Sequence, residues 1–374
     1  MKKLGIVIPT YFAGKLLSRA IESVQASAKK ANVLVDIVVV DCHPKSRDQK
    51  YVTTDIQYFT LPKNPGFGSA ANWGFKKILA NPDIEEILLL NPDAFLDINF
   101  ISILLKKDSE LNQNPKSPLI IFSNTNSVKL EVTERNSEKI NTISRYLKDE
   151  NVYLYSSSGH RIQHHSESMN SLTGYFLVTS KNSSCFMSVG SDDWEKAEFV
   201  QNAGSFYYWP DIAGDIGFNL LRTKQFTKQS SNGAAWCGAA VILSRMYLEI
   251  TKGFDERFFL YYEDTELAIR GSNLGYPPVF MPELIVYHDH SFSTGKNQKE
   301  RAQAIWRSRA LFSSLVAGRG VTLILIVSRF LIGLTRSPFV KLPCSLYNHL
   351  LPELALGLRG VMRSLKKKTK LVGR

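Results

Sequence analysis

The fold is decided by residues 3–41, KLGIVIPTYFAGKLLSRAIESVQASAKKANVLVDIVVVD. Residues 3–10 and 33–41 are apolar and rich in β-branched side chains, which predicts two strands, and residues 13–30 repeat apolar positions at helical spacing. A strand, a helix and a second buried strand in this order form a unit whose two strands run parallel. Asp41 stands at the end of the second strand.

The same alternation continues to about residue 120. Residues 56–62 and 85–93 predict two more strands, with a predicted helix at residues 68–81 between them. We therefore expect an α/β fold with a central, mostly parallel sheet flanked by helices. Ligands of such sheets bind beyond the carboxyl ends of the strands, so that edge is where we expect a site.

The rest of the chain falls into three parts. Residues 124–232 are rich in Ser, Asn and charged side chains and predict a variable insertion or lid with short strands. Residues 233–310 return to clear patterns, with a strand and helix in residues 238–256 and two short strands in residues 277–290. We expect residues 1–310 to form the main domain and residues 311–374 a basic, apolar helical tail.

The composition is typical of a globular protein, with 44% hydrophobic and 21% charged residues. The four cysteines are scattered without metal-type spacing, which predicts reduced thiols in a cytosolic protein. The first residues lead directly into a strand, and we expect no signal peptide.

The net charge of +12 calls for an anionic partner, either nucleic acid or a membrane surface. Basic residues concentrate after Arg319, beside the apolar residues 321–334, and no nucleic-acid recognition motif accompanies them. Arg329 interrupts this apolar run, which is shorter than the roughly 20 residues that cross a bilayer. A helix lying on the inner face of the cell membrane is favoured, and a core-packing helix with a solvated basic end is the alternative.

Several candidate ligand-binding residues lie at the expected carboxyl ends of the N-terminal strands. The segment around Gly66 and Gly68 matches G-x-G-x-x-A, but it follows the third predicted strand instead of the first, which disfavours a dinucleotide oxidoreductase. The glycines would let the backbone approach a nucleotide, and a plain tight turn is the alternative. The full set of nucleotide-binding candidates in this half is Pro9, Thr10, Tyr11, Asp41, Asn64, Gly66, Phe67, Gly68, Asn72, Asn91 and Asp93.

Two aspartates in this set suit different tasks. Asp93 follows an apolar strand and a short turn, and one carboxylate together with diphosphate oxygens is a common way to hold Mg²⁺ or Mn²⁺. Asp41 suits hydrogen bonding to a base or ribose. The alternatives are an Asx-type turn for Asp93 and a capping or loop aspartate for Asp41.

The second half contributes an acid pair and a histidine. Glu263 and Asp264 follow the apolar stretch FFLYY at a predicted helix start, and we favour Asp264 as a general base. Glu263 as the base, or both as ordinary helix acids, are the alternatives. His288 ends a short strand and is either a metal ligand or a structural histidine. Trp236 and Tyr262 could stack on sugar rings or pack in the core.

These motifs together resemble family 2 glycosyltransferases of the GT-A fold, most closely the rhamnosyltransferase-like branch. The resemblance rests on IVIPTY, VVVD, NPGFGSAANWG, LLLNPDA, GAAVILSR, FDERFFLYYEDTEL and YHDHSFSTG. It implies a nucleotide-binding half at residues 1–120 and an acceptor-binding and catalytic half at residues 233–310. It also implies that Asp41 contacts the base or ribose, that Asp93 and His288 bind the metal, and that Asp264 is the base.

The implied reaction is an inverting, metal-dependent transfer of a hexose from a nucleotide sugar to a hydroxyl. The resemblance favours dTDP-L-rhamnose as donor, then UDP-galactofuranose or a UDP-hexose, and a surface-polysaccharide or lipid-linked glycan of the cell envelope as acceptor. Glu263, Tyr262, Trp236 and Gly238 are the acceptor-side candidates. Lys296, Arg307 and Arg309 could close on the diphosphate or be solvated helix charges.

The sequence departs from the family pattern at three places. Phe12 and Cys42 replace the usual asparagines, and Asn91 replaces the first acid of the metal motif. Asp93 is then the only carboxylate of that motif. A catalytically inactive sugar-binding homologue is therefore the strongest rival to an active enzyme.

Overall fold

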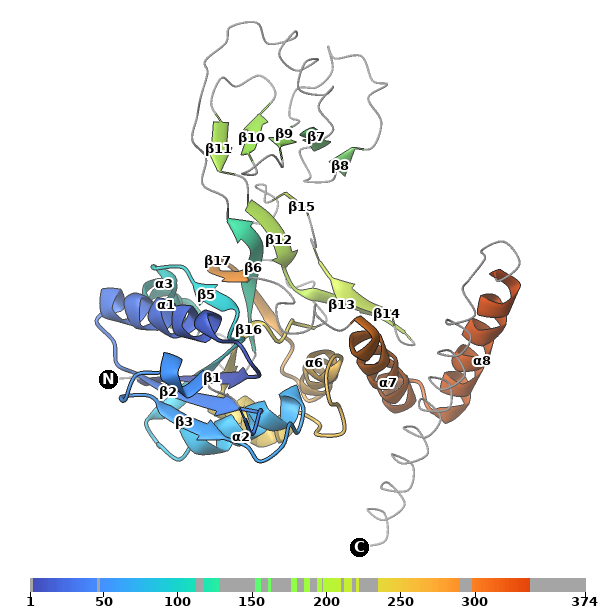
Figure 1. Cartoon of the computed structure of the whole chain (residues 1–374), viewed down its shortest axis with the longest axis horizontal. Coiled ribbons are helices and arrows are strands. Elements are labelled where there is room, and N and C mark those ends of the chain that lie inside the picture. Colours follow the sequence, from blue (N-terminus) through green and yellow to red (C-terminus); the bar gives the residue numbers. More distant parts are fainter. Residues whose placement is uncertain are drawn as a thin grey trace, which may run out of the picture.

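A computed structural model describes residues 3–45, 48–111, 118–127, 152–155, 161–162, 176–179, 185–188, 194–196, 198–209, 212–216, 220–221, 235–288 and 298–336. These residues form a large mixed sheet with helices on both faces, followed by two C-terminal helices (Figure 1). The predicted α/β fold class is confirmed.

The main sheet has ten described strands, and its N-terminal part is parallel. β1 pairs in parallel with β2 and β4, and β2 pairs in parallel with β3, as the strand–helix–strand pattern predicts. β16 inserts antiparallel between β4 and β6. The bounds are β1 (Lys3–Thr10), β2 (Val35–Asp41), β3 (Gln57–Thr60), β4 (Ile84–Leu90), β6 (Leu119–Ser127) and β16 (Ala240–Ser244).

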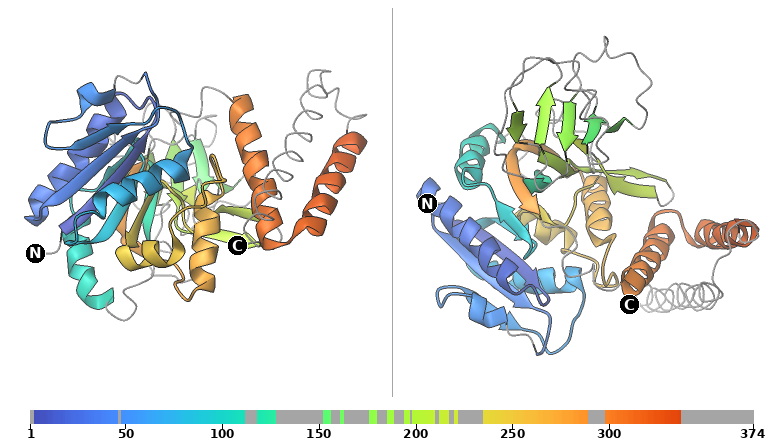
Figure 2. Two further views of the ribbon diagram at one scale, coloured as in Figure 1. Left: turned by 90° about the horizontal axis from the view of Figure 1, so that it is seen from below. Right: turned by 45° about the horizontal axis from the view of Figure 1, so that its top comes forward.

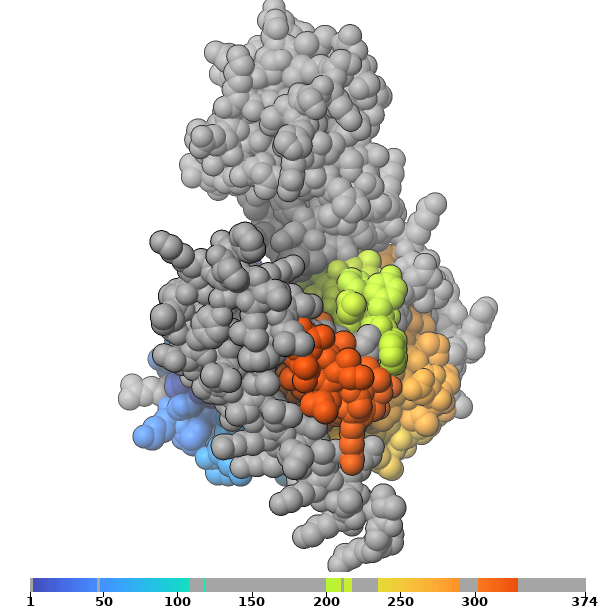
Figure 3. Space-filling view, turned by 90° about the vertical axis from the view of Figure 1, so that its right-hand side faces the viewer, coloured from blue at the N-terminus to red at the C-terminus, as the bar shows by residue number. Residues whose placement is uncertain are grey.

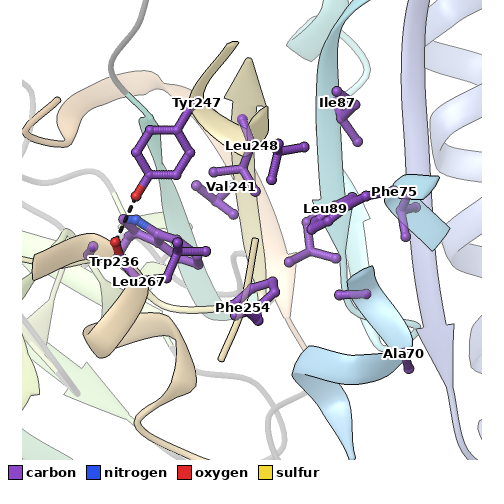
Figure 4. Packing of buried hydrophobic residues seen from close by; sticks show 14 of the residues in the cluster. Ala70, Phe75, Ile87, Leu89, Trp236, Val241, Tyr247, Leu248, Phe254 and Leu267 are labelled. Atoms are coloured by element: carbon purple, nitrogen blue, oxygen red, sulfur yellow. Dashed lines mark hydrogen bonds between the residues drawn. The ribbon is translucent and has the colours of Figure 1, made fainter. Parts of the chain in front are cut away.

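Helices lie on both faces of this sheet (Figure 2), and each set buries apolar residues against it. α1 and α3 cover one face with fully buried residues such as Leu17 and Phe100. α2, α5 and α6 cover the other face around Trp236 and Tyr247 (Figure 4). The bounds are α1 (Lys15–Ala31), η1 (Asp48–Tyr51), α2 (Phe67–Ile78), α3 (Phe100–Leu111), α5 (Arg245–Thr251) and α6 (Glu263–Asn273).

One strand replaces the two short strands predicted for residues 277–290. β17 (Val279–His288) pairs in parallel with β6 and antiparallel with β5 (Ala94–Leu96). Its register with β6 shifts between Met281 and Ile285, and Pro282, which has no N–H to donate, lies in this irregular stretch. The prediction of two strands was wrong because a single irregular strand carries the proline.

Part of the predicted insertion at residues 124–232 belongs to the main sheet. β12 pairs antiparallel with β6, β15 pairs with β12, and β13 and β14 form a hairpin beside them. Five other strands form a separate sheet (Figure 1). The bounds are β7 (Val152–Tyr155), β8 (Arg161–Ile162), β9 (Phe176–Thr179), β10 (Cys185–Ser188), β11 (Trp194–Lys196), β12 (Glu198–Asn202), β13 (Ser205–Tyr208), β14 (Ile212–Asp215) and β15 (Leu220–Leu221).

The C-terminal helices are α7 (Gln298–Val316) and α8 (Arg319–Arg336). The Ser313 and Thr322 hydroxyls join the two helices through a 3.0 Å hydrogen bond between their oxygens. α7 runs through residue 310, so the division between main domain and tail stays a prediction. Within the described part of the chain, no helix has the length and apolar character needed to cross a bilayer.

Candidate active site

The sheet brings Asp93 and His288 together across 195 residues of sequence. Asp93 lies in the turn between β4 and β5, and His288, the last residue of β17, pairs with Ala94 of β5. The Nε2 atom of His288 lies 3.0 Å from the Asp93 Oδ1 atom. Both side chains are buried, and the pairing of His288 with Ala94 places them side by side.

The other ring nitrogen of His288 contacts a residue that sequence reasoning missed. The His288 Nδ1 atom hydrogen-bonds with the Gln201 side-chain oxygen, and Gln201 is buried. Gln201 belongs to β12, inside the segment predicted as an insertion. The short apolar stretch at Phe199 and Val200 was the only signal in the sequence, and it was too short to predict a strand.

The Asp93 and His288 pair fits a divalent cation. Neighbouring ligands in an octahedral shell with bonds of about 2.1 Å are about 3 Å apart, which matches the observed separation of 3.0 Å. Within the described residues, no group of three or more His, Cys, Asp or Glu side chains is arranged to hold a metal ion. The protein would therefore supply two ligands, and a bound substrate and water would supply the others.

Asp264 forms the other side of the site, in the first turn of α6. Its Oδ2 atom accepts a hydrogen bond from the Gly238 N–H at 2.9 Å, and its Oδ1 atom accepts one from the Thr265 N–H at 2.7 Å. Burial raises the pKa of Asp264 from 3.8 to about 6 against the effect of these donors, and the charge of Asp215 adds to the rise. Asp264 is thus suited to accept a proton near neutral pH.

Glu263 is buried more deeply than Asp264. Burial, and then the neighbouring charge of Asp264, raise the pKa of Glu263 well above its usual range. Its Oε2 atom is buried and has no hydrogen-bond partner within the described residues. Because this oxygen is enclosed, Glu263 does not contact an acceptor in this conformation, and its acceptor-binding role stays a prediction.

The loop before Asp264 is held in a strained conformation. Tyr261 and Tyr262 have φ angles of 68° and 66°, which are uncommon for residues other than glycine. Gly66, the residue before α2, packs directly against this loop, since a Cβ atom at Gly66 would lie 2.4 Å from the Phe259 carbonyl oxygen. The Phe67 N–H donates to the same oxygen at 2.9 Å, so the glycine segment packs against the loop that carries the base.

This packing corrects the prediction for Asn72. Its amide was predicted to bind the nucleotide, but its oxygen accepts from the Phe254 N–H at 2.8 Å and its nitrogen donates to the Phe254 carbonyl at 2.9 Å. Gly68 also packs closely against Phe254. The Asn72 side chain therefore holds the loop after α5 in place.

Asp41 also differs from its prediction. It is fully buried, with one carboxyl oxygen accepting from the His43 N–H at 2.9 Å and the other from the Tyr58 hydroxyl. This geometry fits the alternative of a loop aspartate, because neither oxygen is open to a base or ribose. Tyr11 and Phe12, which are 41% and 50% exposed, form the open rim at this edge.

The acceptor-side candidates divide between core and site. Trp236 is fully buried in the core, so the core-packing alternative holds and its ring cannot stack on a sugar in this conformation. Gly238 contributes its N–H to Asp264. Tyr262 is partly buried and contacts Phe312 of α7, with ring centroids 5.3 Å apart.

The remaining candidates are less constrained by the geometry. Pro9 and Thr10 are buried, and Asn64 accepts a hydrogen bond from the Gly66 N–H at 2.9 Å. The Asn91 N–H donates to the Ala239 carbonyl at 2.8 Å. Arg307 is exposed on α7, and Arg309 lies 6.0 Å from the Trp306 ring centroid. Lys296 lies outside the described residues.

A family model described as Glycosyl transferase family 2 matches residues 5–164, which include β1 to β5 and Asp93. This match, which covers less than half of the chain, places residues 5–164 in glycosyl transferase family 2. The family predicted from the sequence motifs is thereby confirmed.

A curated protein similar to this chain is the N-acetylglucosaminyl-diphospho-decaprenol L-rhamnosyltransferase of Mycobacterium tuberculosis, known from two strains. It is 29% identical over 106 residues, which cover 28% of this chain and 33% of the relative. The matched segment therefore spans about a third of the relative's length.

Two solved structures are similar at low sequence identity. Staphylococcus aureus TarS 1–349 in complex with UDP-GlcNAc is 12% identical, with coverage of 83% and 66% of the two chains and a TM-score of 0.38. The mannosyltransferase PcManGT from Pyrobaculum calidifontis, in complex with GDP-Man and Mn²⁺, is 11% identical, with coverage of 98% and 87% and a TM-score of 0.39. TM-scores this low carry no weight, and the fold assignment depends on the sheet topology.

Proposed function

We propose that the chain is an inverting glycosyltransferase that moves a sugar from a nucleotide diphosphate to a hydroxyl group. One observation supports this most directly: the two sides of the site meet at residues 238–239. The Gly238 N–H donates to Asp264, and the next carbonyl, that of Ala239, accepts from Asn91, two residues before Asp93. A base and a candidate diphosphate site therefore lie at one edge of the sheet.

In the proposed reaction, the Asp264 carboxylate removes the proton from the acceptor hydroxyl as its oxygen attacks the anomeric carbon. The bond from that carbon to the diphosphate oxygen breaks on the opposite face, and the nucleotide diphosphate leaves with the electron pair. The backbone donors at Gly238 and Thr265 orient the Asp264 carboxylate.

Asp93 and His288 would hold Mg²⁺ or Mn²⁺, which when bound would offset the negative charge of the diphosphate. Tyr11 and Phe12 are exposed where a nucleobase would lie, and Arg307 is free to approach the phosphates from α7. The fully buried Asp41 would support this region from below the surface.

The best-supported donor is dTDP-L-rhamnose, because the curated relative is named as an L-rhamnosyltransferase. Its named substrate also supports a lipid-linked glycan as acceptor, in the synthesis of a cell-envelope polysaccharide. UDP-galactofuranose and UDP-hexoses are the next donors. A catalytically inactive homologue that binds sugars is the second candidate function, motivated by Asn91 in place of an acid.

A donor screen tests the proposal. Each dTDP- or UDP-sugar is incubated with N-acetylglucosaminyl-diphospho-decaprenol, with Mg²⁺ or Mn²⁺, and the released nucleotide diphosphate is measured. We expect release with dTDP-L-rhamnose above that with the other donors. Binding of a donor without any release would refute the enzyme proposal and favour the inactive homologue.

We also propose that α8 lies on the inner, anionic face of the cell membrane. Leu323, Ile324 and Val327 are exposed on one side of α8, while Thr322 on another side is buried against α7. Val327 is four positions after Leu323 and three after Ile324, so it is a neighbour of both on the helix surface, and the three side chains form an apolar stripe. Figure 3 shows the described parts of α7 and α8 (orange-red) below residues 200–216 (yellow-green) on one face of the molecule.

Vesicle binding tests this second part of the proposal. Ile324→Glu should reduce co-sedimentation with anionic vesicles, because it places a carboxylate in the apolar stripe. Leu34→Glu is a matched control, since Leu34 is equally exposed but lies between α1 and β2. Equal binding of the two variants would exclude α8 as the contact.

A further inference from the structure

Gln201 reaches His288 from a strand on the opposite side of β6. Asn124 of β6 pairs with Val200 of β12 on one edge and with Tyr287 of β17 on the other. Gln201 follows Val200 and His288 follows Tyr287, so the pairing of β12 and β17 with β6 places these two residues close together. Gln201 is 1% exposed, so its amide is enclosed together with the imidazole.

The identity of the contacting atoms determines where the imidazole carries its proton. The Gln201 atom that faces His288 Nδ1 is the carbonyl oxygen, which can only accept a hydrogen bond. The proton of the neutral ring is then on Nδ1, and Nε2 presents a lone pair. That lone pair faces the Asp93 Oδ1 atom at 3.0 Å, which is a second acceptor. In this neutral tautomer two acceptors therefore face each other, an arrangement that a metal ion between them would satisfy.

We propose that Gln201 is a positioning residue that fixes His288 as a metal ligand through Nε2. This inference rests on the metal site of the proposed function and adds the residue that controls it. A partner on the second ring nitrogen of a metal-binding histidine sets both the tautomer and the orientation of the ring. Here a neutral amide has that role, and it is supplied by β12, a strand outside the strand–turn segment that carries Asp93.

The opposite orientation of the Gln201 amide would leave no place for a cation between Asp93 and His288. If the Gln201 NH₂ group donated to Nδ1, the ring proton would be on Nε2 and would donate to Asp93. Asp93 and His288 would then satisfy each other without a cation. The amide orientation therefore distinguishes a metal site from a plain buried hydrogen-bond chain.

Manganese binding without substrate is the first test, measured by the free Mn²⁺ signal in electron paramagnetic resonance. Gln201→Leu should weaken Mn²⁺ binding by about 10- to 100-fold, as loss of a partner behind a histidine ligand usually does. Gln201→Glu should retain most of the affinity, because a carboxylate also accepts from Nδ1–H. Gln25→Leu, on α1, is the control and should bind as wild type does.

The proton position in the metal-free protein is the second test. Long-range proton–nitrogen spectra of the imidazoles should show His288 protonated at Nδ1 in wild type, with the signal assigned by its loss in His288→Asn. A proton on Nε2 in wild type would overturn the inference even if Gln201→Leu does not fold. Equal Mn²⁺ affinity of wild type and folded Gln201→Leu would also overturn it.

The two tests separate this inference from the proposed function. Wild-type protein that binds no Mn²⁺ contradicts the proposed metal site itself. If the His288 proton is then found on Nε2, Gln201, His288 and Asp93 form a simple chain of hydrogen bonds, and Gln201 does not position a metal ligand. Mn²⁺ binding in wild type that is unaffected by Gln201→Leu leaves the metal site standing and removes only the positioning residue.

Discussion

The metal side and the base side of the site are built in different ways. Asp93 and His288 lie at strand ends, where the register between β5 and β17 fixes their positions. Asp264 follows a loop with two residues at positive φ, and close packing from Gly66 keeps that loop in place. The metal side is thus positioned by strand pairing, and the base side by close packing of neighbouring residues.

The electrostatic surroundings differ in the same way. The Asp93 carboxylate faces an imidazole, a group that can become positively charged or share a cation. The Asp264 carboxylate is buried near two other acids, Asp215 and Glu263, and its pKa is raised. Burial beside like charges favours a proton acceptor, whereas pairing with an imidazole favours a cation site.

The largest expected effect separates the two sides by substitution. Asp264→Asn should lower the rate of sugar transfer by about 10²- to 10⁴-fold, because the general base is lost, while Mn²⁺ affinity stays unchanged. Asp93→Asn should instead weaken Mn²⁺ binding more than tenfold, by the loss of a charged ligand. Steady-state transfer rates and Mn²⁺ titrations check both variants.

Full activity of Asp264→Asn would remove the assigned base. In that event Glu263→Gln is the next variant, because Glu263 is the buried carboxyl next to Asp264 at the start of α6. If Asp93→Asn and Asp264→Asn both lose Mn²⁺ binding, the charge of Asp264 also contributes to Mn²⁺ affinity and the two sides do not act independently.

The next effect is the pH dependence of the base side. The pKa of Asp264 is raised to about 6, so kcat/KM for transfer should rise about tenfold per pH unit below pH 6 and level off above it. Mn²⁺ affinity should not follow the same curve through Asp264. A pH–rate profile without an inflection near pH 6 would contradict the environment assigned to this carboxylate.

The ionised Asp264 side chain should also lower the free energy of unfolding at neutral pH. A carboxyl whose pKa is higher in the folded state stabilises the fold below its unfolded pKa, and this contribution is lost as the pH rises through 6. Asp264→Asn should therefore increase the free energy of unfolding at pH 8 by up to about 3 kcal/mol, and the gain should fade from pH 6 towards pH 4. Urea unfolding at the three pH values measures it.

The smallest expected effect concerns the packing of Gly66 against the loop that carries Asp264. Gly66 and Gly275 have φ angles of +94° and +91°, but only Gly66 faces another part of the chain, with nothing within 4 Å of a Cβ atom at Gly275. Gly275→Ala should cost about 1–3 kcal/mol of stability from backbone strain alone. Gly66→Ala should cost more and also slow transfer, because the Phe259 carbonyl must move.

Urea unfolding and transfer rates of the two glycine variants are compared side by side. Equal losses of stability would show that backbone conformation alone decides both positions. An unchanged transfer rate in folded Gly66→Ala would show that the base does not depend on this packing.

The parts of the fold that depend on local patterns could be predicted from the sequence. β1 to β4, α1, α2 and α6 lie where periodicity and turn residues indicated. Asp93 and His288 were also predicted, since Asp93 follows an apolar strand and a short turn and His288 ends another strand, and parallel strands gather their carboxyl ends at one edge. The juxtaposition of these two side chains followed from that rule.

Features set by tertiary contacts could not be predicted. Asp41 and Asn72 carry the residue types of a nucleotide site, but their polar atoms are used inside the protein. Gln201 lies on a short strand whose pairing with β6 shifts register twice, so no sequence period marks it. Hydrogen-bond partners distant in sequence leave no local pattern.

Residues 238–239 give the two sides of the site a fixed spacing. Residues 238–239 contribute only main-chain atoms to this connection: the Gly238 N–H donates to the Asp264 carboxylate, and the Ala239 carbonyl accepts from the Asn91 N–H. Side-chain replacement could alter which sugar or nucleotide the enzyme accepts without changing this separation. Engineering of donor preference should therefore tolerate wide changes in pocket residues, whereas a one-residue insertion or deletion next to β16 should abolish transfer with every donor.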